Sequence, residues 1–290
     1  MTVSNVVERE QHWFAGDGGR RLAATLHGSD TGTPVVMLGG MGQTRHSWDR
    51  AARRIAATGR RAITLDFRGH GESDRAPDGD YSYPRQAADI AAIVAQIGRP
   101  IILVGASLGG KLGLAAASLD GPDVICGLVL VDSVPRSNPQ GISNVARTFK
   151  AGREGYDTLD EAAAELARNR GREPEPGAAE KLRRNMRQTP DGRWRWHWDQ
   201  SYTDPRHKLG LGEGTAWLDR TIPGLTIPVL LARCELSDVV SDEGAAALQA
   251  IVPQMEVETI LGARHMLVGD DNEIFADVLL EWLARHPELA

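Results

Sequence analysis

The stretch Val104-Gly105-Ala106-Ser107-Leu108-Gly109-Gly110 decides how the rest of the chain is interpreted. An apolar, β-branched run precedes it and a run of good helix formers follows it, so we expect a strand, a sharp turn and a helix. Gly105 and Gly109 leave room where the backbone bends and where the helix approaches the strand. Ser107 then projects from the apex of the turn, beside a helix N-terminus that favours developing negative charge.

Composition excludes several classes of partner. The chain has 290 residues and a formal net charge of -6, which argues against nucleic acid or an anionic membrane as its main partner. The segment Met1 to Gln11 is polar, and no apolar run is long enough to span a bilayer, which predicts a cytoplasmic protein. Cys126 and Cys234 lie in or beside apolar runs and are expected to be buried thiols, so neither a disulfide framework nor a metal site is predicted.

Strand and helix patterns alternate along most of the chain. An opening hairpin is expected over 11–27. Strands are then predicted at 34–38, 61–66, 100–105, 124–132, 227–232 and 254–261, and helices at 46–58, 84–97, 107–118, 241–250 and 272–285. This alternation predicts an α/β fold in which a mostly parallel sheet carries helices on both faces.

The alternation stops between residues 136 and 222. This segment is polar, has no clear core strand and is expected to be helical at 159–169 and 177–187. Ligands of open α/β sheets bind beyond the carboxyl ends of the strands, and an insertion that leaves from such an end would cover the site. We therefore predict a helical cap domain over 136–222 and a core domain formed by 1–135 and 223–290. The alternative, an insertion that lies away from any site, is disfavoured.

Side chains at the strand ends supply the partners that a reactive serine needs, namely a base and a carboxylate that orients the base. His265 follows the last predicted strand, and Asp238 follows the strand at 227–232. The carboxyl ends of parallel strands share one edge, so Ser107, Asp238 and His265 can meet. Asp132, directly after the strand at 124–132, is the alternative acid, and Asp242 is a weaker choice because it suits the first turn of a helix.

A glycine-rich loop, Leu38-Gly39-Gly40-Met41-Gly42-Gln43, follows the strand at 34–38. Such a loop can present backbone N–H groups to an oxyanion, and the N–H groups of Met41 and Leu108 are the expected donor pair. A nucleotide site is disfavoured because the loop matches neither the Walker spacing nor a dinucleotide fingerprint.

These features together resemble the α/β-hydrolase family over nearly the whole chain. The resemblance rests on the serine turn at 105–110, on Asp66-Phe67-Arg68-Gly69-His70-Gly71-Glu72-Ser73-Asp74, and on Gly262-Ala263-Arg264-His265. It implies a mostly parallel eight-stranded sheet with a cap after the sixth strand. It also implies the triad and oxyanion donors named above, with structural roles for Arg68 and His70.

Three departures from the family pattern bear on the site. The family commonly has His-Gly where this chain has Gly39-Gly40, so the loop that bears Met41 can be held differently. The family often has Gly where Cys234 stands. Its acid commonly falls three residues later, at the position of Ser237, one residue before Asp238, which keeps Asp132 open as the acid. Serine rather than aspartate at position 107 points away from epoxide hydrolases and haloalkane dehalogenases.

Four of the seven tryptophans fall in the predicted cap. Trp194, Trp196 and Trp198 alternate along one segment, so in an extended conformation they point to one side. They are candidate substrate-binding residues together with Gly40, and packing of the cap onto the core is an equal alternative.

The sequence therefore predicts a capped serine hydrolase that acts on a small, mostly apolar carboxylic ester, thioester or lactone, with no metal or organic cofactor. Two alternatives use the same residues: hydrolysis of a carbon–carbon bond in a diketone, and cofactor-free perhydrolysis. A third alternative is a non-catalytic ligand-binding or signalling protein on a hydrolase scaffold. A homodimer is compatible with the sequence, which does not define the oligomeric state.

Overall fold

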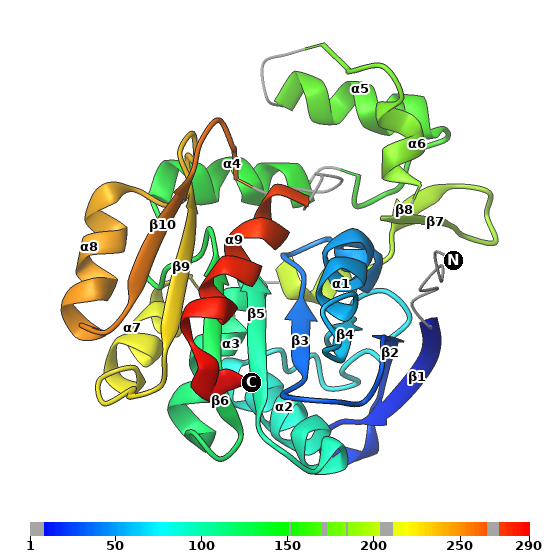
Figure 1. Ribbon diagram of the computed structural model, residues 1–290. Coiled ribbons are helices and arrows are strands. Elements are labelled where there is room, and N and C mark those ends of the chain that lie inside the picture. Colours follow the sequence, from blue (N-terminus) through cyan, green and yellow to red (C-terminus); the bar gives the residue numbers. More distant parts are fainter. Residues whose placement is uncertain (1–8, 151, 170–172, 184, 204–210, 266–272) are drawn as a thin grey trace, which may run out of the picture.

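An eight-stranded sheet forms the centre of the computed structural model, which describes residues 9–150, 152–169, 173–183, 185–203, 211–265 and 273–290. The strand order is β1-β2-β4-β3-β5-β6-β9-β10 (Figure 1). The strands are β1 (Arg9–Ala15), β2 (Arg21–His27), β3 (Val35–Leu38), β4 (Ala62–Leu65), β5 (Ile101–Ala106), β6 (Ile125–Val131), β9 (Val229–Cys234) and β10 (Glu256–Ile260). This is the mostly parallel sheet with helices on both faces that the sequence predicted.

Six neighbouring strands of the sheet run parallel to one another, namely β4, β3, β5, β6, β9 and β10. In contrast, β2 is antiparallel to both β1 and β4. The carboxyl ends of β3, β5, β6, β9 and β10 consequently lie along one edge of the sheet. That edge is the place where ligands bind in open α/β sheets.

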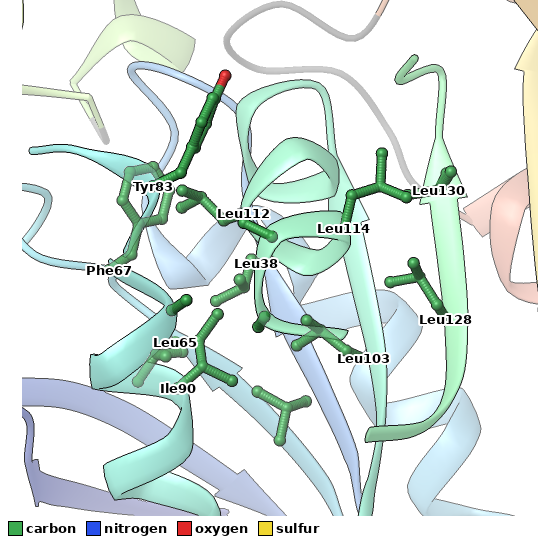
Figure 2. Close-up of a cluster of buried hydrophobic side chains, with 14 of the residues drawn as sticks. Leu38, Leu65, Phe67, Tyr83, Ile90, Leu103, Leu112, Leu114, Leu128 and Leu130 are labelled. Atoms are coloured by element: carbon green, nitrogen blue, oxygen red, sulfur yellow. The ribbon is translucent and has the colours of Figure 1, made fainter. Parts of the chain in front are cut away.

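Alternate residues of each strand enter two different hydrophobic clusters. On β3, Val36 and Leu38 face one cluster and Val35 and Met37 face the other, as a period of two requires. Leucines of the first cluster interdigitate between the sheet and two helices that cover it (Figure 2). Both faces are buried, which is why these strands are apolar throughout.

Helices divide between the two faces. The first cluster takes residues from α2 (Tyr83–Ile97), α3 (Leu108–Asp120), α7 (Leu211–Thr221) and α8 (Asp242–Ile251). The second takes residues from α1 (Asp49–Ala56) and α9 (Glu273–Arg285). Short 3-10 turns lie at Asp17–Gly19, Arg45–Trp48, Gln200–Thr203 and Pro287–Leu289. Residue 272, the expected first residue of the last helix, lies outside the described residues.

Between β6 and β9 the chain leaves the sheet for an insertion, a name used here for residues 136–222. It contains α4 (Pro139–Lys150), α5 (Leu159–Asn169), α6 (Ala178–Leu182) and α7, together with the antiparallel hairpin of β7 (Met186–Gln188) and β8 (Trp194–Trp196). In Figure 1, α4, α5, α6 and the hairpin lie at the end of the molecule toward which β3 and β5 point.

One predicted helix of the insertion is wrong in its extent. The sequence predicted a helix over 177–187, but α6 ends at Leu182, and Met186 pairs with Trp196 in the hairpin. The aromatic and β-forming residues of β8 provide a strand partner, which the pattern of 177–187 alone does not contain. The division into separate cap and core domains stays a prediction.

Among the residues that the structure describes, no helix has the length and apolar character needed to cross a lipid bilayer. Cys234 is buried and Cys126 is half-buried.

Candidate active site

Ser107 occupies a strained turn between β5 and α3. Its φ of 48° and ψ of -110° lie outside the regions that a non-glycine residue ordinarily adopts. Such backbone strain costs about 1–3 kcal/mol and persists only where surrounding structure imposes it. Here the Ser107 N–H donates to the Val131 carbonyl at 3.0 Å, and its carbonyl accepts from Ser133 Oγ at 2.6 Å. These bonds tie the serine turn to the end of β6.

Two glycines allow this turn because no side chain fits at their positions. A Cβ on Gly105 would lie 2.3 Å from the carbonyl oxygen of Gly109, and a Cβ on Gly109 would lie 2.5 Å from that of Gly39. Both obstacles are backbone atoms, which cannot move aside without displacing a strand or a helix. The expected strand, turn and helix are therefore present for the physical reason that the sequence suggested.

His265 and Asp132 form a buried pair beside this turn. His265 Nδ1 lies 2.6 Å from Asp132 Oδ2, and both side chains are almost fully buried. An ionised carboxylate only accepts, so Nδ1 carries the proton and donates it to Asp132. The other ring nitrogen, Nε2, is then free of a proton in the neutral imidazole and can act as a base.

Asp132 is held in place by several bonds. It is, with Ser107, one of two non-glycine residues at positive φ in the described part of the chain. Its N–H donates to the Ala232 carbonyl, and its carboxylate accepts from the Cys234 N–H at 3.1 Å and from Ser237 Oγ at 2.7 Å. These donors fix the carboxylate and stabilise its charge.

The two candidate acids have different surroundings in the structure. Asp238 is exposed, and its carboxylate accepts a hydrogen bond from Asn144 Nδ2 on α4 at 3.2 Å rather than facing His265. The carboxylate on His265 is that of Asp132, the alternative. Asp242 lies in the first turn of α8, as expected, and pairs with Arg233. Ser237 is the sequence signal that could have favoured Asp132, because a serine stands where the family commonly places its acid.

The glycine-rich loop after β3, residues 39–43, is called the oxyanion loop below. Gln43 Oε1 accepts from the Gly40 N–H at 2.7 Å, and a Cβ on Gly40 would lie 3.3 Å from Ser107 Cβ, so the loop passes directly beside the serine. Within the part of the chain that the structure describes, no protein acceptor takes the N–H of Met41 or of Leu108. Both donors are therefore available to a bound group.

Two histidines hold the far end of the oxyanion loop at Gly42. His70 Nε2 accepts from the Gly42 N–H at 3.2 Å. His197, from the insertion, lies with its Nε2 3.1 Å from the Gly42 carbonyl, while its Nδ1 accepts from the Gly71 N–H at 2.7 Å. Phe149 of α4 packs against the Gly42 Cα, where a Cβ would lie 2.4 Å from the ring. The structural role predicted for His70 is thus visible as a contact.

Burial keeps both histidines neutral. Loss of hydration lowers the pKa of His197 to about 4 and lowers the pKa of His70 well below its ordinary value. Arg68, from the same loop as His70, pairs with Asp89 in the interior. None of these three side chains is free for acid–base chemistry at neutral pH, so their contribution is to shape the loops.

The three tryptophans of the insertion do not share one environment. Trp196 and Trp198 are buried, and the ring of Phe149 meets both edge-on, with centroids 6.0 and 5.6 Å away. Trp194 instead lines a cavity of about 570 Å³ within the insertion, with Arg183 over its ring. Trp194 therefore lies apart from the other two tryptophans. Trp196 and Trp198 are buried with Phe149 in the first hydrophobic cluster, and the contact of the three tryptophans with a substrate stays a prediction.

Comparisons with known proteins identify the fold family of the chain. The family model described as alpha/beta hydrolase fold matches residues 33–271. The chain is 28% identical to an sn-1-specific diacylglycerol lipase of Mus musculus over 89% of this chain and 83% of the lipase. It is 30% identical to an esterase of Mycobacterium tuberculosis over 74% of this chain and 70% of the esterase. An alpha/beta hydrolase from Novosphingobium aromaticivorans superposes with a TM-score of 0.76 at 25% identity, covering 96% of this chain and 99% of that one.

The chain therefore belongs to the α/β-hydrolase fold family. Within it, the chain is a serine hydrolase that resembles esterases and lipases.

Proposed function

We propose that this protein hydrolyses a small, mostly apolar carboxylic ester, thioester or lactone through an acyl-enzyme formed on Ser107. His265 is the general base, Asp132 is the carboxylate that orients it, and the N–H groups of Met41 and Leu108 form the oxyanion hole. One observation carries the proposal: the buried 2.6 Å contact from His265 Nδ1 to Asp132 leaves Nε2 as the free base, at the sheet edge where the half-buried Ser107 lies in its turn.

The reaction would proceed in two halves. Ser107 Oγ attacks the carbonyl carbon while its proton passes to His265 Nε2, and the carbonyl oxygen takes up negative charge. When the tetrahedral intermediate collapses, the bond to the leaving alcohol or thiol breaks, and that group takes the proton from Nε2. Water then attacks the acyl group with Nε2 again as base, which releases the acid and restores the Ser107 hydroxyl.

Two features support an ester of modest size. The insertion contributes Phe149, Trp196 and Trp198, which lie on the oxyanion loop or on one another and make this side of the site apolar. The relatives include proteins named as an esterase and as a diacylglycerol lipase, and ester cleavage is common to both names. We therefore propose that the insertion is a cap that limits the size of the acyl group.

A fluorophosphonate probe tests the proposed chemistry. The purified protein and its Ser107→Ala and His265→Ala variants are treated with the probe, and intact mass and peptide mapping locate the adduct. A single adduct on Ser107 of the wild type that is absent from Ser107→Ala and strongly slowed in His265→Ala is the expected result. A folded wild type that acquires no adduct on Ser107 would contradict the proposal.

Substrate profiling then separates the reaction classes. We expect turnover of p-nitrophenyl esters to fall as the acyl chain grows beyond the space under the insertion. A series of esters, thioesters and lactones is compared with diketones, and with peracid formation in hydrogen peroxide. Preferential cleavage of a diketone would replace ester hydrolysis by carbon–carbon bond hydrolysis in the same site.

A further inference from the structure

The oxyanion loop is anchored from three parts of the chain. Gln43 comes from the loop itself, His70 comes from the loop after β4, and His197 comes from the insertion. The contact with His197 spans 155 positions in the sequence, and the ring that makes it is 7% exposed. The insertion thus reaches past the surface of the core and bonds to backbone beside the site.

The anchored atoms flank the donor that the proposed mechanism needs. The Met41 N–H belongs to the peptide between Gly40 and Met41. On one side of that peptide the Gly40 N–H is held by Gln43, and the Gly40 carbonyl accepts from the Gln43 N–H at 3.1 Å, which closes a turn with Met41 and Gly42 at its centre. On the other side both the N–H and the carbonyl of Gly42 are held by histidines. Gly42 has a φ of 79°, a glycine conformation that is flexible unless its neighbours fix it. The direction of the Met41 N–H therefore depends on these contacts.

The tautomer of His197 follows from its two partners. A backbone N–H, that of Gly71, points at Nδ1, so Nδ1 must accept and carries no proton. The proton of the neutral ring is then on Nε2, which donates it to the Gly42 carbonyl. One ring thus links the oxyanion loop to the loop after β4, and a side chain with only one polar atom could not do both.

We infer that His197 is a positioning residue that makes the oxyanion hole depend on docking of the insertion. The inference rests on the proposed function and deepens it, because it assigns the insertion a role in kcat as well as in substrate choice. Only with His197 in place are both polar groups of Gly42 satisfied, and the turn that carries the Met41 donor is then held on both sides before the oxyanion forms. Phe149 packs on the same glycine from α4, so two elements of the insertion act at one residue.

The surroundings of His197 keep it in the form that this role needs. Burial is the main cause that lowers the pKa of His197, the hydrogen bond to the Gly42 carbonyl acts against it, and the guanidinium groups of Arg187 and Arg75 add to the lowering. His70, its aromatic neighbour at a centroid distance of 5.7 Å, is neutral as well. An imidazolium would lose the acceptor at Nδ1 and release Gly71.

Two near-isosteric variants separate the two hydrogen bonds of His197, one to Gly42 and one to Gly71. In His197→Gln the amide nitrogen reaches the position of Nε2 and can still donate to the Gly42 carbonyl, whereas the acceptor for Gly71 is lost. In His197→Asn the amide oxygen takes the position of Nδ1 and can still accept from Gly71, whereas the donor to Gly42 is lost. Each variant removes one hydrogen bond, so a purely structural role predicts similar effects from both.

Tyr202→Phe is the matched control. Tyr202 also belongs to the insertion, is buried, and bonds through its hydroxyl to the Arg68 carbonyl at 2.9 Å and to Gln86 at 2.8 Å. It ties the insertion to the core without touching the oxyanion loop. Its loss should lower stability and leave kcat on p-nitrophenyl acetate close to that of the wild type.

The expected result is asymmetric. His197→Asn should lower kcat about tenfold with little change in KM, short of the 10²–10³ lost when an oxyanion donor is removed, and His197→Gln should keep kcat within about threefold. Amide hydrogen exchange over residues 39–43 should accelerate in His197→Asn and stay near the wild-type rate in His197→Gln and Tyr202→Phe. Equal kcat values and equal exchange in the two His197 variants would overturn the inference.

The proposed function and this inference fail in different ways. A wild type that neither labels on Ser107 nor hydrolyses any ester defeats the proposed function, and hydrogen exchange over 39–43 still decides whether His197 holds the loop. If neither variant folds, ¹⁵N-histidine NMR of the wild type decides the point, because it reads which ring nitrogen carries the proton. The inference requires the proton of His197 on Nε2, and a proton on Nδ1 would contradict it.

Discussion

Asp132 is the residue on which the electrostatics of the site depend. It has no exposed surface, and its charge is compensated by the Cys234 N–H, by Ser237 Oγ and by His265 Nδ1. In the proposed mechanism, a buried carboxylate with several donors is a fixed negative charge that stabilises the imidazolium formed when His265 takes the serine proton. The exposed carboxylate of Asp238 can supply no comparable field, because water screens it.

Exchange of each acid for its amide tests this assignment. Asp132→Asn should lower kcat by about 10³–10⁴, because the amide presents an N–H to Nδ1 and favours the wrong tautomer of His265. Asp238→Asn is the matched control and should stay within about threefold of the wild type, since it alters an exposed contact with Asn144. Steady-state kinetics on p-nitrophenyl acetate measure both. A larger loss in Asp238→Asn would restore Asp238 as the acid.

Ser237 offers a sharper prediction. Its Oγ lies 2.7 Å from Asp132 Oδ2, the oxygen that is also 2.6 Å from His265 Nδ1. An aspartate at 237 would place a carboxylate where the family commonly has it. In the background of Asp132→Asn, the added Ser237→Asp change should therefore recover about tenfold or more of the lost kcat, as coupled neighbours do not act additively.

The single variant Ser237→Asp serves as the control for that double variant. It sets two carboxylates close together in a buried place, so we expect it to be less stable than the wild type by urea denaturation. No recovery in a folded double variant would show that position 237 cannot reach His265.

At the scale of single elements, the serine turn depends on close approach of backbone to backbone. Gly109→Ala places a methyl group 2.5 Å from the Gly39 carbonyl oxygen, and we expect a loss of about 1–3 kcal/mol in the free energy of unfolding together with slower labelling of Ser107. Gly113→Ala, one turn later in α3, is the matched control. Its methyl group would meet only the side-chain ends of Leu128 and Leu103, which can shift, and alanine favours the helix by up to about 1 kcal/mol.

Urea denaturation and the rate of fluorophosphonate labelling measure the two glycine variants. We expect Gly113→Ala to unfold close to the wild-type midpoint and to label at the wild-type rate. Equal stability of Gly109→Ala and Gly113→Ala would mean that the backbone of the oxyanion loop moves away from α3 at little cost.

The elements of the sheet could be predicted from sequence because their signals are local. Apolar runs of strand length alternate with helical periodicity, and both faces of the sheet are buried, so the pattern and the structure share one cause. The end of α6 could not be predicted in the same way, since Met186 leaves the helical pattern to pair with Trp196 across the hairpin. That pairing is a contact between two separate segments, and the pattern of residues 177–187 alone does not contain it.

The site could be predicted in part for a related reason. Ser107 and His265 follow from their places at strand ends, whereas the choice between Asp132 and Asp238 depends on which carboxylate turns toward the histidine. The direction of Asp132 is set by its positive φ and by donors from β9 and from Ser237, which are contacts between segments more than 100 residues apart. The contact of His197 with the oxyanion loop could not be predicted either, because one histidine among tryptophans carries no local signal.

At the scale of the whole molecule, the insertion and the core are joined by buried polar contacts as well as apolar packing. His197 bonds to Gly42 and Gly71, and Tyr202 bonds to the Arg68 carbonyl. Buried polar groups cost free energy unless they are paired, so these contacts favour one docked arrangement over many looser ones. The same burial makes the protein sensitive to acid, because the neutral histidines must stay neutral while the protein is folded.

The direction of this pH dependence follows from the histidine pKa values. Burial lowers the pKa of His27 and that of His197 to about 4, whereas an unfolded chain protonates its histidines near pH 6.5. Between these values the unfolded state binds more protons, so stability falls as pH falls from about 6.5 to about 4 and is unaffected by these groups above that window. Each of these two histidines should lower the free energy of unfolding by about 2 kcal/mol at pH 5 relative to pH 7.5.

His27 isolates this effect from catalysis because it lies on β2, away from the serine turn, and within the described structure neither of its ring nitrogens has a hydrogen-bond partner. His27→Leu should therefore change the free energy of unfolding little at pH 7.5 and raise it by about 2 kcal/mol relative to the wild type at pH 5. Urea denaturation of both proteins at both pH values measures the difference between variant and wild type. A change in packing contributes equally at the two pH values, so it cancels when this difference at pH 5 is compared with that at pH 7.5. If the gain at pH 5 equals that at pH 7.5, His27 is not the buried neutral group that its surroundings indicate, and the acid sensitivity of the fold must arise elsewhere.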